Sequence, residues 1–272
     1  MSTYKAESDL SRLNRDGASG WVAVDRDVVE VILASKRVHS LSRGAFDPTV
    51  LPLMRLWGFR EGKPHRPSLT AITRTLDAVG LEHVSVDSVG GRVRYERLGV
   101  SLDLGGIAKG YALDVAKRAA IDAGAAAGQL DLGGNLLVFG SEASGRAAIQ
   151  DPNSRDGVVG VIDLQDVSVA TSGGYERYVE IEGKRYGHII DPRTGYPAEG
   201  VASVTVVSDQ AVIADALSTA CYVMGRDACL EMVEEIDRVE ALVLWLDGTD
   251  LKSGASRGLG LLWSEGGDDP LD

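Results

Sequence analysis

An aspartate and a threonine four residues apart have the spacing in this sequence that best suits a metal ion. Asp215 and Thr219 fall in a helix predicted over residues 211–224, where positions i and i+4 share one face. A carboxylate and a hydroxyl are hard oxygen donors of the kind that Mg²⁺ takes, with water and phosphate in its other positions. The alternative is structural, with Asp215 near a helix start and Thr219 bonded to its own i−4 carbonyl.

A second segment carries the pattern of a phosphate-binding turn. Residues 101–106 have the sequence Ser-Leu-Asp-Leu-Gly-Gly, which predicts a short strand that ends in two glycines. A helix predicted from residue 108 brings Lys109 into its first turn, where unpaired N–H groups and a partial positive charge suit phosphate. The spacing is not that of a P-loop, and a purely structural turn is the alternative.

His188 is the best general-base candidate among the four histidines of this sequence. It begins a segment that holds Asp, Arg and Thr within seven residues, and a Thr-Ser-Gly-Gly segment precedes it at 171–174. The alternative is a turn built on Asp-Pro-Arg-Thr-Gly. A further candidate is Asp47, which Pro48 holds in an extended conformation that could present it to a ligand.

The elements that must position these residues form a mixed pattern. The pentapeptide Leu-Asp-Leu-Gly-Gly at 102–106 recurs at 130–134, which predicts a strand–helix–strand crossover unit. Many strands, few long helices and no regular β–α repeat indicate an α+β (mixed α/β) fold. Helices are expected over residues 25–39, 69–79, 108–123, 211–224 and 227–236, and hairpins around Gly90-Gly91 and Glu182-Gly183.

Composition excludes several classes of protein. The 272 residues include 28 Lys+Arg and 40 Asp+Glu, so the net charge of −12 argues against a nucleic-acid partner. The sequence has no apolar run of about 18 residues, so no membrane span is expected. It shows no secretory signal, so the chain as given has the pattern of a cytoplasmic protein, while its compartment stays undecided. Cys221 and Cys229 are expected to be two buried thiols.

Taken together, these segments resemble the ApbE family of FAD:protein FMN transferases. The resemblance implies an ApbE-like fold of mixed sheets and packed helices, in one flavin transferase domain over residues 1–263. The end of the chain, residues 264–272, is expected to be a disordered tail. The matching segments cover nearly the whole chain and lie at residues 1–14, 44–50, 57–59, 103–111, 131–135, 170–177, 188–197 and 214–219.

The resemblance implies a reaction that composition does not. Such enzymes bind FAD with Mg²⁺, cleave its diphosphate and attach FMN through a phosphoester bond to a threonine of an acceptor protein, while AMP leaves. Two alternatives stay open: hydrolysis of FAD to FMN and AMP at the same site, and a flavin-binding member without turnover.

The resemblance also implies roles for particular residues. Tyr4 would stack on the isoalloxazine ring, and His188 would help to deprotonate the incoming threonine. Asp215 would take part in catalysis by holding Mg²⁺, together with Thr219 and the backbone carbonyl of Gly106. The other implied contacts with FAD are Ala45, Phe46 and Asp47 at the adenosine half, Asp103 and Lys109 near the diphosphate and ribose, and the backbone of Ile189.

Members of the family usually have more chain before the segment that matches residues 1–4. That chain often includes an export signal, and family members are often extracytoplasmic. It then includes a strand of the flavin site. We therefore expect one flank of the isoalloxazine pocket to be absent from the residues given in this sequence.

Overall fold

The computed structural model of this chain describes residues 1–60, 62–154, 156–174, 177–261 and 263–265. The chain divides into two units, each made of two stretches of sequence. The first unit comprises Met1–Ala108 with Glu176–Glu199, and the second comprises Lys109–Tyr175 with Gly200–Asp272.

Helices of the first unit begin at side chains that accept hydrogen bonds from the first turn. Ser8, Asp25 and Ser68 each accept a backbone N–H in this way, which stabilises the helix start. The predicted helices over 25–39 and 69–79 are thereby confirmed. The helical elements of this unit are α1 (Asp9–Asp16), η1 (Gly17–Ser19), α2 (Arg26–Leu41), η2 (Pro48–Val50), α3 (Leu51–Leu56), α4 (Leu69–Leu76) and η3 (Leu81–His83).

Two small antiparallel sheets complete the first unit. One has the strand order β1-β3-β2, and the other is the β9–β10 hairpin. Glu182 and Gly183 turn this hairpin with φ angles of 52° and 78°, so both predicted hairpins are confirmed. The strands are β1 (Val22–Ala23), β2 (Val84–Asp87), β3 (Arg92–Tyr95), β9 (Tyr178–Ile181) and β10 (Lys184–Gly187).

The second unit is built on a six-stranded antiparallel sheet with the order β13-β12-β11-β8-β5-β4. A three-stranded sheet, β14-β7-β6, packs on one of its faces through a shared apolar cluster that includes Ile162, Leu164 and Val207. The strands are β4 (Gly128–Leu132), β5 (Asn135–Phe139), β6 (Gly145–Gln150), β7 (Val158–Leu164), β8 (Ser168–Gly173), β11 (Ser203–Ser208), β12 (Val239–Asp247), β13 (Asp250–Ala255) and β14 (Trp263–Glu265).

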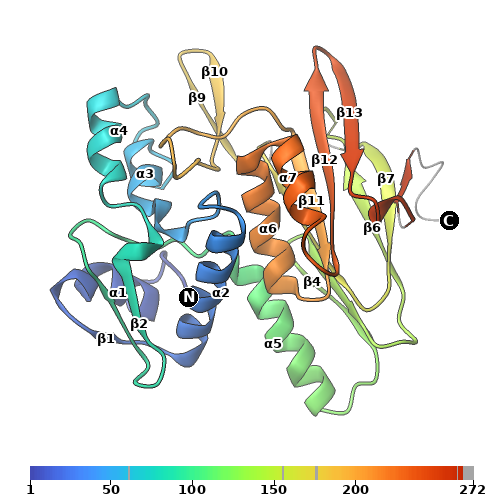
Figure 1. Cartoon of the computed structure of the whole chain (residues 1–272), viewed down its shortest axis with the longest axis horizontal. Helices are drawn as coiled ribbons and strands as arrows, with labels where there is room; N and C mark the ends of the chain where they lie inside the picture. Colours follow the sequence, from blue (N-terminus) through green and yellow to red (C-terminus); the bar gives the residue numbers. More distant parts are fainter. Residues whose placement is uncertain (61, 155, 175–176, 262, 266–272) are drawn as a thin grey trace. The chain divides into compact units, whose positions relative to one another are not determined.

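Helix α6 (Ala211–Met224) packs against β8 and β11 of the large sheet, and α7 (Arg226–Val233) packs against α6 and β12 (Figure 1). Because β11 is covered on both faces, all six of its residues are buried. The last helical elements are α5 (Ala108–Asp122) and the short turn η4 (Leu259–Leu261). The predicted helices over 108–123, 211–224 and 227–236 are confirmed, with small shifts at their ends.

The predicted crossover unit is wrong. The segment 101–104 does not form a strand, because Asn14 and the Pro48 carbonyl accept hydrogen bonds from the Leu102 and Asp103 N–H groups. The second copy of the pentapeptide ends β4, and Gly133 and Gly134, with φ angles of 60° and 85°, reverse the chain into β5. Every strand pairing in the described ranges is antiparallel.

The two cysteines are buried as predicted, but the prediction that they are thiols is wrong. Cys221 and Cys229 are joined by a disulfide, and both are fully buried. Gly225, with a φ angle of 81°, ends α6 and lets α7 fold back, which brings the two Cα atoms to 4.7 Å. Cysteines eight residues apart in one continuous helix would lie too far apart for this bond.

The structure differs from the sequence-based prediction at the first two residues of the predicted tail. Ser264 and Glu265 belong to β14 and pair with Val161 and Gly160 of β7. Residues 266–272 lie outside the described part of the chain. No helix in that described part has the length and apolar character needed to span a membrane.

Candidate functional site

In the second unit, helices α5 and α6 meet at a glycine. A Cβ on Gly110 would lie 2.1 Å from the Ala211 carbonyl oxygen and 2.7 Å from Asp215 Cβ, so a side chain does not fit. This close approach lets the Gly110 N–H donate to Asp215 Oδ2 over 2.9 Å. The predicted metal ligand is therefore held by the first turn of the neighbouring helix.

In a second contact between the same helices, the hydrogen-bond donors lie on α6 and the acceptor lies on α5. Asp114 on α5 accepts hydrogen bonds from the N–H groups of Ala211 and Val212 at 3.0 and 2.9 Å. These two groups belong to the first turn of α6, which lacks a capping side chain of its own. Asp114 therefore fixes the start of the helix that carries Asp215 and Thr219.

Asp215 is a buried carboxylate, only 4% exposed. Burial raises its pKa above the ordinary value, and the Gly110 N–H and the positive charge of Lys109 oppose that rise. A buried carboxylate is costly when ionised unless a positive charge or a metal ion compensates it. Asp215 is thus a side chain that a bound cation would stabilise in its charged form.

Hydroxyl groups gather one helical turn beyond Asp215. Ser172 on β8 brings its Oγ to 2.9 Å from Ser218 Oγ and 3.2 Å from Thr219 Oγ1. Ser218 also donates to the Asp215 carbonyl over 2.8 Å. Thr219 therefore contacts the sheet, rather than the i−4 carbonyl that the structural alternative required.

Lys109 is held by the turn between β4 and β5. Its Nζ donates to Asn135 Oδ1 over 3.0 Å and lies 3.4 Å from the Gly133 carbonyl oxygen. Asn135 is 2% exposed, and its side chain interacts with the Asp215 carboxylate, which opposes the rise in the pKa of Asp215. The Lys109 ammonium group is a charged donor of the kind that suits an oxyanion.

The oxygens of this cluster suit Mg²⁺. No group of three or more His, Cys, Asp or Glu side chains that could hold a metal occurs in the part of the chain that the structure describes. Mg²⁺ does not need one, because it binds one or two carboxylates and takes water and substrate phosphates as its remaining ligands. Asp215 and Thr219 are hard donors of this kind. Gly106, the third predicted ligand, stands in the turn before α5 and has a backbone carbonyl of the same character.

In the first unit, Asp103 connects a backbone turn to an arginine. Its Oδ1 accepts the Gly105 N–H over 2.7 Å, and its Oδ2 accepts a hydrogen bond from Arg60 Nη2. Asp103 and Arg60 are 7% and 12% exposed in their side chains, so the ion pair is mostly buried. Buried pairs of this kind are little screened by solvent.

His188 follows β10 directly and is half-buried. Its Nδ1 lies 3.0 Å from the Arg177 carbonyl oxygen. A carbonyl only accepts, so in the neutral ring Nδ1 carries the proton and Nε2 is the basic nitrogen. Burial lowers the pKa of His188, and the charges of Arg177 and Arg60 lower it further, while the Arg177 carbonyl and Asp103 act in the opposite direction. His188 is therefore neutral at neutral pH, as a general base must be.

The loop predicted to contact adenosine is buried. Ala45, Phe46 and Asp47 are 1%, 4% and 6% exposed. The Asp47 carboxylate accepts hydrogen bonds from the Thr49 N–H at 2.8 Å and the Leu81 N–H at 3.1 Å. Burial raises the pKa of Asp47 above its ordinary range, against these hydrogen bonds. The carboxylate therefore shapes the loop, and the predicted contact of Asp47 with FAD remains a prediction.

Tyr4 and Ile189 differ in exposure. The Tyr4 ring is 74% exposed, and the Arg60 guanidinium lies 4.4 Å from its centroid. Ile189 is 8% exposed, and its carbonyl accepts the Ala198 N–H over 2.9 Å. An exposed aromatic ring suits stacking on a planar group, which is the role predicted for Tyr4.

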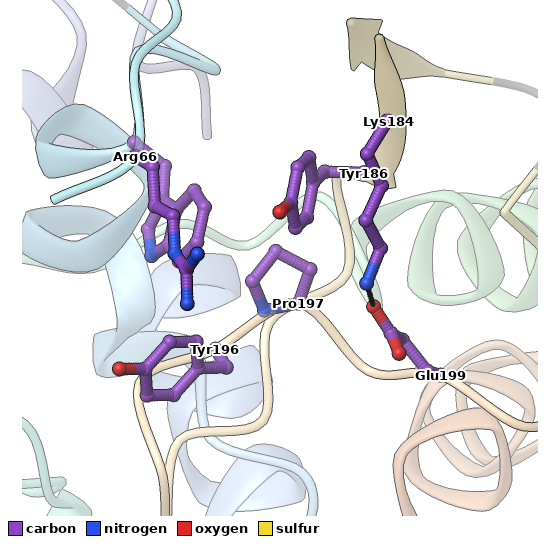
Figure 2. A pocket seen from close by; sticks show the side chains of 7 residues that line it. Arg66, Lys184, Tyr186, Tyr196, Pro197 and Glu199 are labelled. Carbon is purple, nitrogen blue, oxygen red and sulfur yellow. Dashed lines mark ion pairs between the residues drawn. The ribbon is translucent and has the colours of Figure 1, made fainter. Parts of the chain in front are cut away.

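A pocket of about 320 Å³ lies in the first unit and contains no residue that the sequence analysis assigned to the site. Figure 2 shows Tyr186 and Tyr196 on either side of Pro197, with Lys184 paired to Glu199 at 2.8 Å. Trp57 is fully buried beside the two tyrosines, with its ring centroid 5.4 Å from Tyr186 and 5.8 Å from Tyr196. The sequence signals for it were the Trp-Gly-Phe and Gly-Tyr-Pro segments. The complete lining is Trp57, Arg66, Lys184, Tyr186, Tyr196, Pro197 and Glu199.

The predicted residues are divided between the two units. Lys109, Asp215 and Thr219 belong to the second unit, and the others belong to the first. Sequence reasoning missed the residues that hold these groups in place. Two of these residues, Asn135 and Ser172, stand beside pairs of glycines, which is a signal in the sequence. The other two, Asp114 and Arg60, stand in no motif that singles them out.

A sequence model described as the ApbE family matches residues 1–243. The chain belongs to the ApbE family. Relatives named FAD:protein FMN transferase are found in Vibrio cholerae, with 34% identity over 94% of this chain and 78% of the relative, and in Haemophilus influenzae, with 32% identity over 91% of this chain and 75% of the relative. The expected family and the expected enzyme class, a transferase, are thereby confirmed.

Solved structures of ApbE proteins share this fold. The ApbE protein of Thermotoga maritima matches with a TM-score of 0.87 and 37% identity, over 97% of this chain and 86% of the other. The Pseudomonas stutzeri flavinyl transferase ApbE matches with a TM-score of 0.84 and 30% identity, over 98% of this chain and 84% of the other. The expected α+β, ApbE-like fold is confirmed.

Proposed function

We propose that this chain transfers FMN from FAD to a threonine of an acceptor protein, with Mg²⁺ bound and AMP as the leaving group. The observation that carries the proposal is the buried carboxylate of Asp215, held by the Gly110 N–H with a hydroxyl cluster one turn away. The names of the relatives supply the substrate and the transferred group, since the Vibrio cholerae and Haemophilus influenzae proteins are named FAD:protein FMN transferase.

The proposed reaction is a displacement at phosphorus. The threonine oxygen attacks the phosphorus of the FMN half, the bond from that phosphorus to the bridging oxygen breaks, and AMP leaves with the bridging oxygen. The threonine proton passes to Nε2 of His188, which the Nδ1 contact with the Arg177 carbonyl leaves basic. The product is a threonine phosphoester of FMN.

The predicted metal ligands and Lys109 would stabilise the charge that develops during this step. Mg²⁺, when bound by Asp215, Thr219 and the Gly106 carbonyl, would neutralise negative charge on the phosphate oxygens. Lys109 Nζ would donate hydrogen bonds to these oxygens. Positive charge would therefore be concentrated at the phosphate oxygens, although the net charge of the chain is −12.

Mass spectrometry of an acceptor domain tests the proposal. The chain is incubated with FAD, Mg²⁺ and an acceptor that carries a flavinylation threonine, and the acceptor should gain the mass of one FMN group while AMP appears. Asp215→Asn should abolish the transfer, and Asp163→Asn, which changes an exposed aspartate on β7, should not.

Two results would contradict the proposal. AMP release at a rate unaffected by the acceptor would indicate an FAD pyrophosphatase. Tight FAD binding by folded protein with no AMP release under any metal would indicate a flavin-binding protein without turnover.

A further inference from the structure

Arg60 is a buried cation with unused hydrogen-bond donors. It follows the Trp-Gly-Phe segment after α3, and its side chain is only 12% exposed. Its Nη2 donates to Asp103, whereas its Nε and Nη1 are buried and have no hydrogen-bond partner within the described residues. Among the described residues, Arg60 is the one charged side chain with buried donors in this condition.

Unpaired donors on a buried charge are unusual in folded proteins. A guanidinium has five N–H donors and no acceptor, and native structures pair nearly all buried polar groups. An unpaired buried donor costs stability, and a donor on a charged group costs more. Such an arrangement persists where a ligand supplies the missing acceptors, so the Nε and Nη1 groups point to an acceptor that binds here.

The surroundings of Arg60 indicate the chemistry of that acceptor. Asp103 neutralises the guanidinium in the free protein, and the other oxygen of Asp103 holds the Gly105 N–H in the turn before α5. Arg60 also lies against the exposed Tyr4 ring, and its positive charge lowers the pKa of His188. The cation thus lies among first-unit residues for which the family resemblance implies contact with FAD or with the incoming threonine.

We propose that Arg60 binds an oxyanion of the substrate, donating from Nε and Nη1 to nonbridging oxygens of the FAD diphosphate. Arginine suits this task because hydrogen bonds from a charged donor to a phosphate oxygen are short and strong, and its planar donors fit several oxygens at once. Asp103 is then a positioning residue that holds the guanidinium through Nη2. This inference rests on the proposed function, and it assigns a phosphate contact to a residue outside the predicted set.

Binding titrations with three ligands test this assignment. ADP carries the diphosphate without the flavin, riboflavin carries the flavin without phosphate, and FAD carries both. Each is titrated into the full chain with Mg²⁺ and without an acceptor. Arg60→Met should weaken ADP and FAD about 10–100-fold and leave riboflavin unchanged. Arg60→Lys, which keeps the charge but not the planar donors, should show a smaller loss.

Two controls separate binding from folding. Arg15→Met changes an exposed arginine on α1 and should bind all three ligands as the unaltered chain does. Arg60→Met leaves Asp103 as an unpaired buried carboxylate, so Arg60→Met/Asp103→Asn is compared with Asp103→Asn alone. The double variant should fold, as judged by circular dichroism, and should still bind ADP more weakly than the single variant.

The outcomes distinguish this inference from the proposed function. If the unaltered chain binds neither FAD nor ADP, the proposed function fails. If it binds both and the Arg60 variants bind ADP equally well, only the oxyanion role of Arg60 is overturned. A loss of riboflavin affinity as large as the loss of ADP affinity would also overturn it, because the contact would then be to the flavin ring.

Discussion

The Gly110 N–H donates to Oδ2 of Asp215 across 105 residues of sequence, with a nitrogen–oxygen distance of 2.9 Å. This hydrogen bond requires that residue 110 has no side chain, because a Cβ there would overlap the Ala211 carbonyl. The geometry of the proposed metal ligand therefore depends on a glycine in another helix.

Gly110→Ala should remove most of the transfer activity. The methyl group forces α5 and α6 apart, so the Gly110 N–H no longer reaches Asp215, and overpacking of this kind costs about 1–3 kcal/mol of stability. Urea unfolding and the rate of FMN transfer measure the two effects. Gly260→Ala is the matched control, since a Cβ at Gly260 meets nothing within 4 Å. Full activity of Gly110→Ala would show that the close approach is dispensable.

Thr219→Val should weaken Mg²⁺ binding, and Thr219→Ser should largely preserve it. Valine has the shape of threonine but lacks the hydroxyl that lies 3.2 Å from Ser172 Oγ, whereas serine keeps it. The measurement is the Mg²⁺ concentration that gives half-maximal transfer at saturating FAD. Equal Mg²⁺ requirements for the valine and serine variants would remove Thr219 from the proposed ligand set.

In the pH profile of FMN transfer, the apparent pKa of the acid limb should lie below the ordinary histidine pKa of 6.5. Burial and the nearby charges of Arg177 and Arg60 lower the pKa of His188, so its neutral, proton-accepting form persists to lower pH. The rate of transfer at saturating FAD and Mg²⁺, measured from pH 5 to 8, should therefore fall only toward the acid end of this range.

Substitution of Asp103 offers a check on this assignment. Asp103 acts to raise the pKa of His188, so Asp103→Asn should move the acid limb to still lower pH. A limb that does not move in Asp103→Asn, and that also survives in His188→Gln, would indicate that another group accepts the proton.

Loss of the disulfide should destabilise the second unit. Cys221 and Cys229 link α6 to α7, and closing a loop of this length contributes about 2–3 kcal/mol in the chain-entropy description. Cys221→Ser/Cys229→Ser should therefore unfold at lower urea concentration than the oxidised chain, while the reduced unaltered chain should resemble the variant. Coincident unfolding curves for oxidised chain and variant would argue against the bond.

Helical periodicity and spacing predicted much of the local structure. Asp215 and Thr219 were expected on one face of a helix over 211–224, and α6 has those bounds. The strand expected at 101–106 did not form, because its N–H groups bond to Asn14 and to the Pro48 carbonyl, which are distant in sequence. The same pentapeptide forms a hairpin at 130–134, where its two glycines adopt positive φ angles.

The sequence by itself determined the family, the helix that carries Asp215 and Thr219, and the types of side chain offered to a metal and a phosphate. Only the tertiary structure decided which polar atoms have partners. Gly110 and Asp215 are 105 residues apart, and Arg60 and Asp103 are 43 residues apart. Periodicity records which face of an element is apolar, but a hydrogen bond or ion pair between distant residues exists only once packing has brought its two ends together.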